Sequence, residues 1–164
     1  MRKINLVLAL TMVSVLSFAA WASAASQTVQ GTGDIEKLVV NNAQKALKVN
    51  LYGFDPPCEA KYMKILITWG KKAAYAVDNG CYPGSTWAKS LVYMSNKAKP
   101  EGGKLVDCKK LKFRYVKSDG SYRAVVPRSC MPKARDKVKV SAYGNNFSST
   151  TGGEAGPTKS LRRG

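Results

Sequence analysis

Apolar and polar residues alternate along much of this chain, which is the pattern of β-strands with one buried face. The clearest run has Leu47, Val49 and Leu51 on one face and Lys48 and Asn50 on the other. Further strands are predicted from apolar runs at residues 35–40, 62–69, 73–77, 87–94, 111–116, 122–126 and 138–142. No segment has a convincing helical pattern, so the chain is predicted to be all-β.

Residues that favour tight turns separate these runs. Gly70-Lys71-Lys72 stands between two runs, and so does Asp119-Gly120, a dipeptide that is a strong hairpin signal in that position. The turn signals recur roughly every 8 to 15 residues, a spacing typical of β-sandwich domains. We therefore predict an antiparallel β-sandwich of immunoglobulin-like size rather than a closed barrel.

The first residues have the three parts of a secretory signal peptide. A cationic start at residues 1–3 is followed by an apolar run, Ile4 to Trp21, and by the small triplet Ala22-Ser23-Ala24. A membrane anchor is the alternative, but polar residues dilute the run and the triplet follows it at once. We predict cleavage near Ala24 and a protein that is secreted, either extracellular or associated with the cell wall.

The rest of the chain is predicted to form one domain with irregular ends. Ser26 to Gly33 is a polar lead segment, whereas Asn145 to Gly153 is rich in Asn, Ser, Thr and Gly and is predicted to be a long exposed loop. The predicted boundaries are a signal peptide at 1–24, a β-sandwich domain at 25–144, and a polar loop with a basic C-terminal tail at 145–164.

Four cysteines, an even number, follow the signal peptide: Cys58, Cys81, Cys108 and Cys130. In an exported chain this predicts two disulfides, for which three connectivities exist. We favour Cys58–Cys81 with Cys108–Cys130, because each pair closes a loop of roughly 25 residues that is worth about 3 kcal/mol in the chain-entropy model. A zinc site is the alternative, and the lack of histidine and of a C-x-x-C motif argues against it.

The chain is strongly basic, with 27 Lys and Arg against 10 Asp and Glu and a net charge of +17. Loss of Arg2 and Lys3 with the signal peptide leaves +15. Such a charge predicts attraction to polyanions, whereas the alternative is that the lysines only solvate the outer strand faces. The candidate polyanion-binding residues would form one stripe if all outward faces lie on one sheet: Lys110, Lys112, Arg114, Arg123, Lys137 and Lys139.

The sequence contains no histidine, which removes Ser-His-Asp and Cys-His nucleophilic sites and histidine acid–base chemistry as they are usually built. Carboxylate pairs for glycoside hydrolysis remain, with Asp55 and Glu59 or Asp107 and Asp119 as the candidates. Such spacings also arise by chance, so we predict a protein without catalytic residues, cofactor or metal.

Two segments of the chain are similar to segments of a known group of proteins. They are Gly31-Thr32-Gly33-Asp34 and the stretch from Tyr122 to Cys130, Tyr-Arg-Ala-Val-Val-Pro-Arg-Ser-Cys. The chain resembles small exported proteins of high-GC Gram-positive bacteria that have a signal peptide, a Gly-x-Gly-Asp start, a V-P-R-S-C segment after a hairpin and no assigned activity. The resemblance implies an immunoglobulin-sized β-sandwich and transfers no catalytic residue. This chain departs from that group in its many lysines.

These observations predict a non-enzymatic, exported binding or structural protein, with an anionic polymer of the cell envelope as the expected partner. The alternative is a secreted effector or inhibitor that docks on a protein through the loops at 95–104 and 145–153. A small carboxylate-dependent hydrolase is the third reading.

Overall fold

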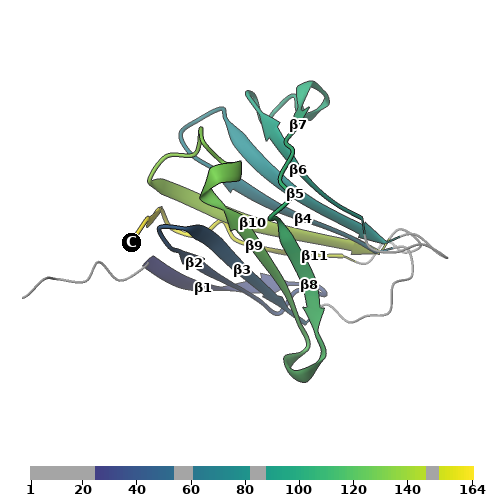
Figure 1. Ribbon diagram of the computed structural model, residues 1–164. Coiled ribbons are helices and arrows are strands. Elements are labelled where there is room, and N and C mark those ends of the chain that lie inside the picture. Colours follow the sequence, from purple (N-terminus) through teal and green to yellow (C-terminus); the bar gives the residue numbers. More distant parts are fainter. Residues whose placement is uncertain (1–24, 54–60, 82–87, 147–151) are drawn as a thin grey trace, which may run out of the picture.

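The computed structural model describes residues 25–53, 61–81, 88–146 and 152–164 (Figure 1). The predicted signal peptide, Cys58, Asp55 and Glu59 lie outside these residues. Within the described ranges no helix is long and apolar enough to cross a membrane. The strands are β1 (Ala25–Thr32), β2 (Lys37–Asn42), β3 (Ala46–Tyr52), β4 (Lys61–Thr68), β5 (Ala74–Cys81), β6 (Ala88–Met94), β7 (Lys104–Leu105), β8 (Lys112–Val116), β9 (Ser121–Pro127), β10 (Lys137–Asn146), β11 (Gly152–Ala155) and β12 (Leu161–Arg162), with 3₁₀ turns η1 (Pro100–Gly102), η2 (Lys117–Asp119) and η3 (Arg128–Cys130).

The strands form one antiparallel, curled sheet in the order β7-β6-β5-β4-β10-β11-β1-β2-β3-β9-β8, with β12 beside β10. We call β1, β2, β3, β9 and β8 the β3 half, and β11, β10, β4, β5, β6 and β7 the β4 half. In Figure 1 the β4 half occupies the upper part and the β3 half the lower part. The predicted all-β, antiparallel architecture is confirmed. A sandwich of two separate sheets is not confirmed, because β1 and β11 pair and so connect the two halves.

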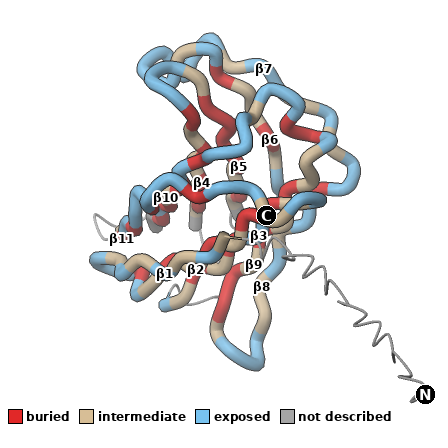
Figure 2. Tube along the Cα trace, turned by 90° about the vertical axis from the view of Figure 1, so that its left-hand side faces the viewer, coloured by how far each residue is buried: buried red, intermediate tan, exposed pale blue. Residues whose placement is uncertain are grey.

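The inner faces of both halves meet in one hydrophobic core, as Figure 2 shows by the burial along the strands. On β3, Val49 and Leu51 are fully buried, and on β4 the same holds for Ile65 and Ile67. Val140 of β10 joins them in the same cluster. The predicted alternation is thus confirmed on these strands. Most strands place their other face toward solvent, whereas on β5 the other face is buried too, where Ala74 and Ala76 form a small second cluster with Met94.

Glycines form the joint between the two halves. A Cβ on Gly31 would lie 2.0 Å from the carbonyl oxygen of Ile35, and one on Gly33, whose φ is 61°, would lie 2.0 Å from that of Gly152. A Cβ on Gly153 would lie 2.5 Å from the amide nitrogen of Ile35. The Gly-x-Gly-Asp segment therefore has a structural role, because it lets the turn after β1 touch the start of β11.

The polar lead segment is strand β1, which sequence analysis missed. It pairs with β2 through six consecutive residues and so forms part of the joint. Its outward positions are the exposed Ser26, Thr28 and Gln30, whereas Gln27 and Val29 face inward and are half-buried. The outward face of β1 is polar, and its inward face is also partly polar. The strand therefore lacks the alternation of apolar and polar residues by which a strand is recognised.

The C-terminal segment also differs from the prediction, because it belongs to the domain. β10 continues past residue 144 to Asn146, β11 pairs with both β10 and β1, and Leu161 of β12 is only 6% exposed. The buried Asn42 amide donates to the Leu161 carbonyl at 2.8 Å and to the Asp136 carbonyl at 3.2 Å. These bonds between a buried side chain and distant backbone hold the segment in place.

The Cys108–Cys130 disulfide is present as predicted, with a Cα–Cα distance of 5.5 Å. It excludes these two cysteines as zinc ligands. The bond connects the segment between β7 and β8 to η3, and a loop of this size is worth about 3 kcal/mol in the chain-entropy model. The predicted Cys58–Cys81 bond involves Cys58 and lies outside the described residues.

We expect Gly31→Ala to lower the free energy of unfolding by about 2 kcal/mol, because the new methyl group overlaps the Ile35 backbone and must force the joint apart. Urea denaturation monitored by tryptophan fluorescence measures the change. Gly102→Ala is the matched control, since a Cβ there meets nothing within 4 Å. Equal stability of the two variants would contradict the structural role of Gly31.

Candidate functional site

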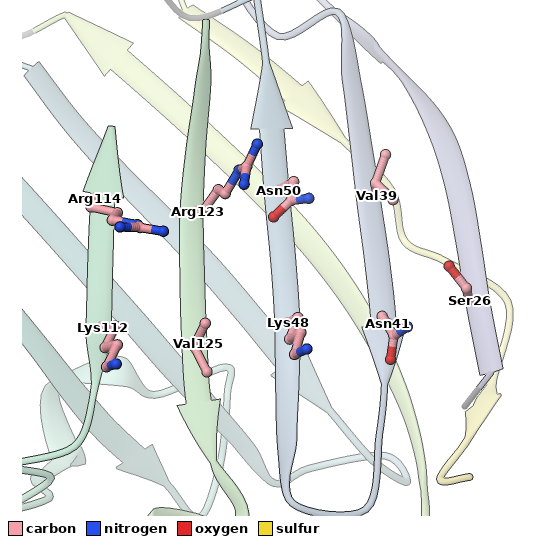
Figure 3. A pocket seen from close by; sticks show the side chains of 9 residues that line it. All are labelled: Ser26, Val39, Asn41, Lys48, Asn50, Lys112, Arg114, Arg123 and Val125. Atoms are coloured by element: carbon pink, nitrogen blue, oxygen red, sulfur yellow. The ribbon is translucent and has the colours of Figure 1, made fainter. Parts of the chain in front are cut away.

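The outer face of the β3 half contains a hollow of about 530 Å³, which we call the first hollow (Figure 3). Five strands contribute to it, so it extends across the whole width of this half. Its lining is Ser26 from β1, Val39 and Asn41 from β2, Lys48 and Asn50 from β3, Arg123 and Val125 from β9, and Lys112 and Arg114 from β8.

Strand register determines which side chains meet in the first hollow. Lys48 lies opposite Val125, which lies opposite Lys112 on the next strand. Two residues further along β3, Asn50 lies opposite Arg123. Because alternate residues of each strand fill the core, these side chains point outward together. Figure 3 shows them projecting from adjacent strands into one concave surface.

Two arginines face each other across strands in this hollow. Arg114 of β8 is the direct cross-strand partner of Arg123 of β9. Like charges in that position destabilise a sheet, so the arrangement is unfavourable unless something offsets it. For Arg123 the offset is a carboxylate: its guanidinium pairs with Asp119, and its Nε donates to the Ser121 hydroxyl at 3.2 Å.

Asp119 is fixed by the same network. The Ser121 hydroxyl donates to its carboxylate at 2.6 Å. This hydrogen bond, together with the adjacent Arg123 guanidinium, holds the pKa of Asp119 below its usual range. The carboxylate therefore stays ionised and neutralises Arg123. Among the described residues, Lys48, Lys112 and Arg114 form no ion pair, so they supply the net positive charge of the hollow.

Amide side chains lie between the cations. Asn41 and Asn50 line the hollow from neighbouring strands, and each amide has both donor and acceptor atoms. The Asn41 Oδ1 atom is inaccessible to solvent and has no hydrogen-bond partner in the described part of the chain. The hollow thus combines positive charge with the Asn50 amide, which can bind hydroxyls.

The predicted stripe is divided by the fold. Lys112, Arg114 and Arg123 come together in the first hollow, whereas the exposed Lys110 precedes β8 and does not line it. Lys137 and Lys139 lie on β10, in the β4 half, and line a different hollow. The stripe required every outward face to lie on one side of one sheet, and the curl of the sheet separates β8 from β10.

Sequence analysis missed Lys48, Asn41 and Asn50 as members of the site. The alternation in β3 correctly placed Lys48 outward. Only the strand order, with β3 between β2 and β9, shows that it shares a surface with Lys112.

The carboxylate candidates for hydrolysis are not assembled by the described structure. Asp119 is committed to Arg123 and is held ionised, which is the opposite of what a general acid needs. Asp107 lines a separate hollow beside Cys108. Asp55 and Glu59 lie outside the described residues. Within those residues no group of three or more Cys, Asp or Glu side chains is placed to hold a metal ion.

Comparison with known proteins adds no family assignment to this geometry. No protein-family model matches the chain, and no curated protein sequence matches it. The chemistry of the first hollow is therefore argued from its own residues.

We expect Asp119→Asn to strengthen retention on a sulfated polysaccharide such as heparin, because it frees the Arg123 charge inside the hollow. Elution from a heparin column in a salt gradient measures the effect. Glu101→Gln, which changes the net charge equally on the β4 half, is the control and should move elution less.

The same comparison has a defined pH dependence. A lowered pKa means that the Asp119–Arg123 pair persists at pH 3.8, where an ordinary aspartate is half protonated. The difference between Asp119→Asn and the unaltered protein should disappear only at still lower pH, when Asp119 itself becomes neutral. A difference that vanished already above pH 3.8 would show that the pair does not control binding.

Proposed function

We propose that the protein is exported, loses residues 1–24 and binds an anionic, hydroxyl-bearing polymer of the cell envelope through the first hollow. The role is one of binding, without catalysis. We also propose that the two halves of the curled sheet correspond to the two layers of a β-sandwich. A second disulfide, Cys58–Cys81, is part of the same proposal. It also includes the kinship with the small exported proteins that the Gly31-Thr32-Gly33-Asp34 start resembles.

The observation that carries the proposal is the cross-strand pair of Arg114 and Arg123, flanked by Lys48 and Lys112. A fold gains nothing from like charges placed opposite each other. Departures from such local rules are expected where function requires them. Asp119 offsets the charge of Arg123, but Lys48, Lys112 and Arg114 have no carboxylate partner among the described residues, and a bound anion would neutralise them.

The shape and chemistry of the hollow suit an extended polymer. Its lining comes from five adjacent strands of the antiparallel sheet. Val39 and Val125 are the only apolar side chains among the nine lining residues. The amide of Asn50 adds hydrogen-bonding groups for hydroxyls between the charged groups. A polymer with repeated phosphates or carboxylates and with sugar or polyol hydroxyls presents the matching pattern.

Single-stranded nucleic acid matches the hollow less well. Proteins that bind it combine positive charge with aromatic side chains on which bases stack. None of the nine lining residues is aromatic. Tyr52 shares the outward face of β3, but the Lys37 ammonium covers its ring, 4.5 Å from the centroid. The absence of a free stacking surface in this part of the structure favours the envelope polymer.

The test is a salt series of binding to isolated cell envelope and to heparin, with duplex DNA as a third arm. The variant changes Lys48, Lys112 and Arg114 to Ser. Its charge-matched control changes Lys89, Lys104 and Lys109 to Ser, which are exposed and outside the first hollow. Removing three contacts should reduce the slope of log affinity against log salt by about 2 to 3, whereas the control should keep its slope.

Equal weakening of both variants would mean that total charge, and not the hollow, attracts the polymer. Salt-independent retention on envelope would overturn the proposal and favour a protein partner. Retention on duplex DNA that exceeds retention on both other ligands would reassign the hollow to nucleic acid.

A further inference from the structure

A second basic surface lies on the outer face of the β4 half. It consists of a hollow of about 470 Å³ and an adjoining one of about 610 Å³, which share Gly70, Lys137 and Ser160. We call the two together the second hollow. Its cations are Lys97, Arg135, Lys137, Lys139 and Arg162.

The strands place these cations outward for the same reason as in the first hollow. On β10, Val138 and Val140 are buried in the core, so Lys137 and Lys139 project from the opposite face. Lys139 is the cross-strand partner of Thr68 on β4.

The segment after β11 forms the opposite wall of the second hollow. Thr158 binds the β10 backbone twice, with its amide donating to the Val140 carbonyl at 2.9 Å and its hydroxyl accepting from the Val140 amide at 3.0 Å. Pro157 and Ser160 on either side then line the hollow. Because Thr158 is only 2% exposed, this wall is fixed by burial as well as by hydrogen bonds.

The charge of the second hollow is barely compensated. Asp136 is the single carboxylate among the lining residues, and it pairs with Arg163, which is not one of them. Within the described ranges none of the five cations forms an ion pair. Five uncompensated charges on one surface attract anions and repel one another.

The two hollows lie on the outer faces of different halves of the sheet. Val49 of the β3 half and Val140 of the β4 half meet in the same core. Their neighbours Lys48 and Lys139 project from the other face of each strand, and therefore away from that core.

We propose that the second hollow is a separate binding site for the same class of anionic polymer, so that one molecule links two polymer chains. This inference rests on the proposed function of the first hollow. Linking would follow from the position of the sites on the outer faces of two different halves and needs no second copy of the protein.

The first experiment is calorimetric titration of the purified, oxidised protein with heparin disaccharides, the shortest repeating unit of that polymer. We expect about two sites per protein, and about one in a variant with Lys97, Lys137 and Lys139 changed to Ser. The first-hollow variant should also retain about one site. The control with Lys89, Lys104 and Lys109 changed to Ser should keep both.

The second experiment measures linking directly. The protein is captured on immobilised heparin, washed, and exposed to fluorescent heparin. The second-hollow variant should still be captured but should retain at least about tenfold less fluorescent polymer than the charge-matched control. Urea denaturation confirms that each variant is folded.

The outcomes separate the two proposals. If the unaltered protein is not captured on heparin at all, the proposed function fails. If it is captured and has one site, or if the second-hollow variant retains as much fluorescent heparin as the control, only the inference fails. Equal retention of fluorescent heparin by the second-hollow variant and the control would also arise if two copies of the protein associated. In either case the second hollow would not be the site that links the polymers.

Discussion

The two halves of the sheet depend on a backbone contact that has no room for a side chain. Gly31 and Gly33 at the end of β1 touch Ile35 and the start of β11, and only two residue pairs connect β1 with β11. This short joint sets the angle at which the halves meet, and hence brings both inner faces into one core. Because every strand alternates, the position of the core then decides which residues face solvent. Both basic hollows are consequences of that geometry.

Charge is concentrated by the fold in a way that works against stability. The unpaired cations Lys48, Lys112 and Arg114 of the first hollow repel one another, and so do the cations around Lys137 in the second. Asp119 and Asp136 each neutralise one arginine, so the remaining cations keep their charge. The hydrophobic core and the Cys108–Cys130 bond must supply the free energy that this repulsion removes.

The sequence was sufficient to predict a strand wherever that strand buries an apolar face. Each alternating run overlaps a strand, and the inward residues of β3 were identified correctly. Strand β1 was missed because hydrogen bonding and the glycine joint, rather than apolar burial, hold it in the sheet. The C-terminal segment was missed because its anchors are single residues: Thr158, Leu161 and the distant Asn42.

The candidate site was predictable only in part, for a related reason. Alternation shows that Lys112, Arg114 and Lys139 face outward, but it contains no information about which strands become neighbours. Lys48 and Lys112 are separated by 64 positions in the sequence, and β9 alone brings them together. The predicted stripe therefore combined residues of β8 with residues of β10, although these strands belong to different halves of the sheet. Only the strand order shows this.

Strand β8 ends the strand order of the described residues, so within them one side of its backbone pairs with no other strand. Such an edge is a template for adding a strand from another molecule, and lysine or arginine side chains along it are a common protection. Lys112 and Arg114 are exposed on this strand. The charges that form the first hollow thus also keep the edges of neighbouring molecules apart. Neutralising Lys112 and Arg114 would remove this protection of the edge, so the solubility of the protein depends on two of the side chains that line the first hollow.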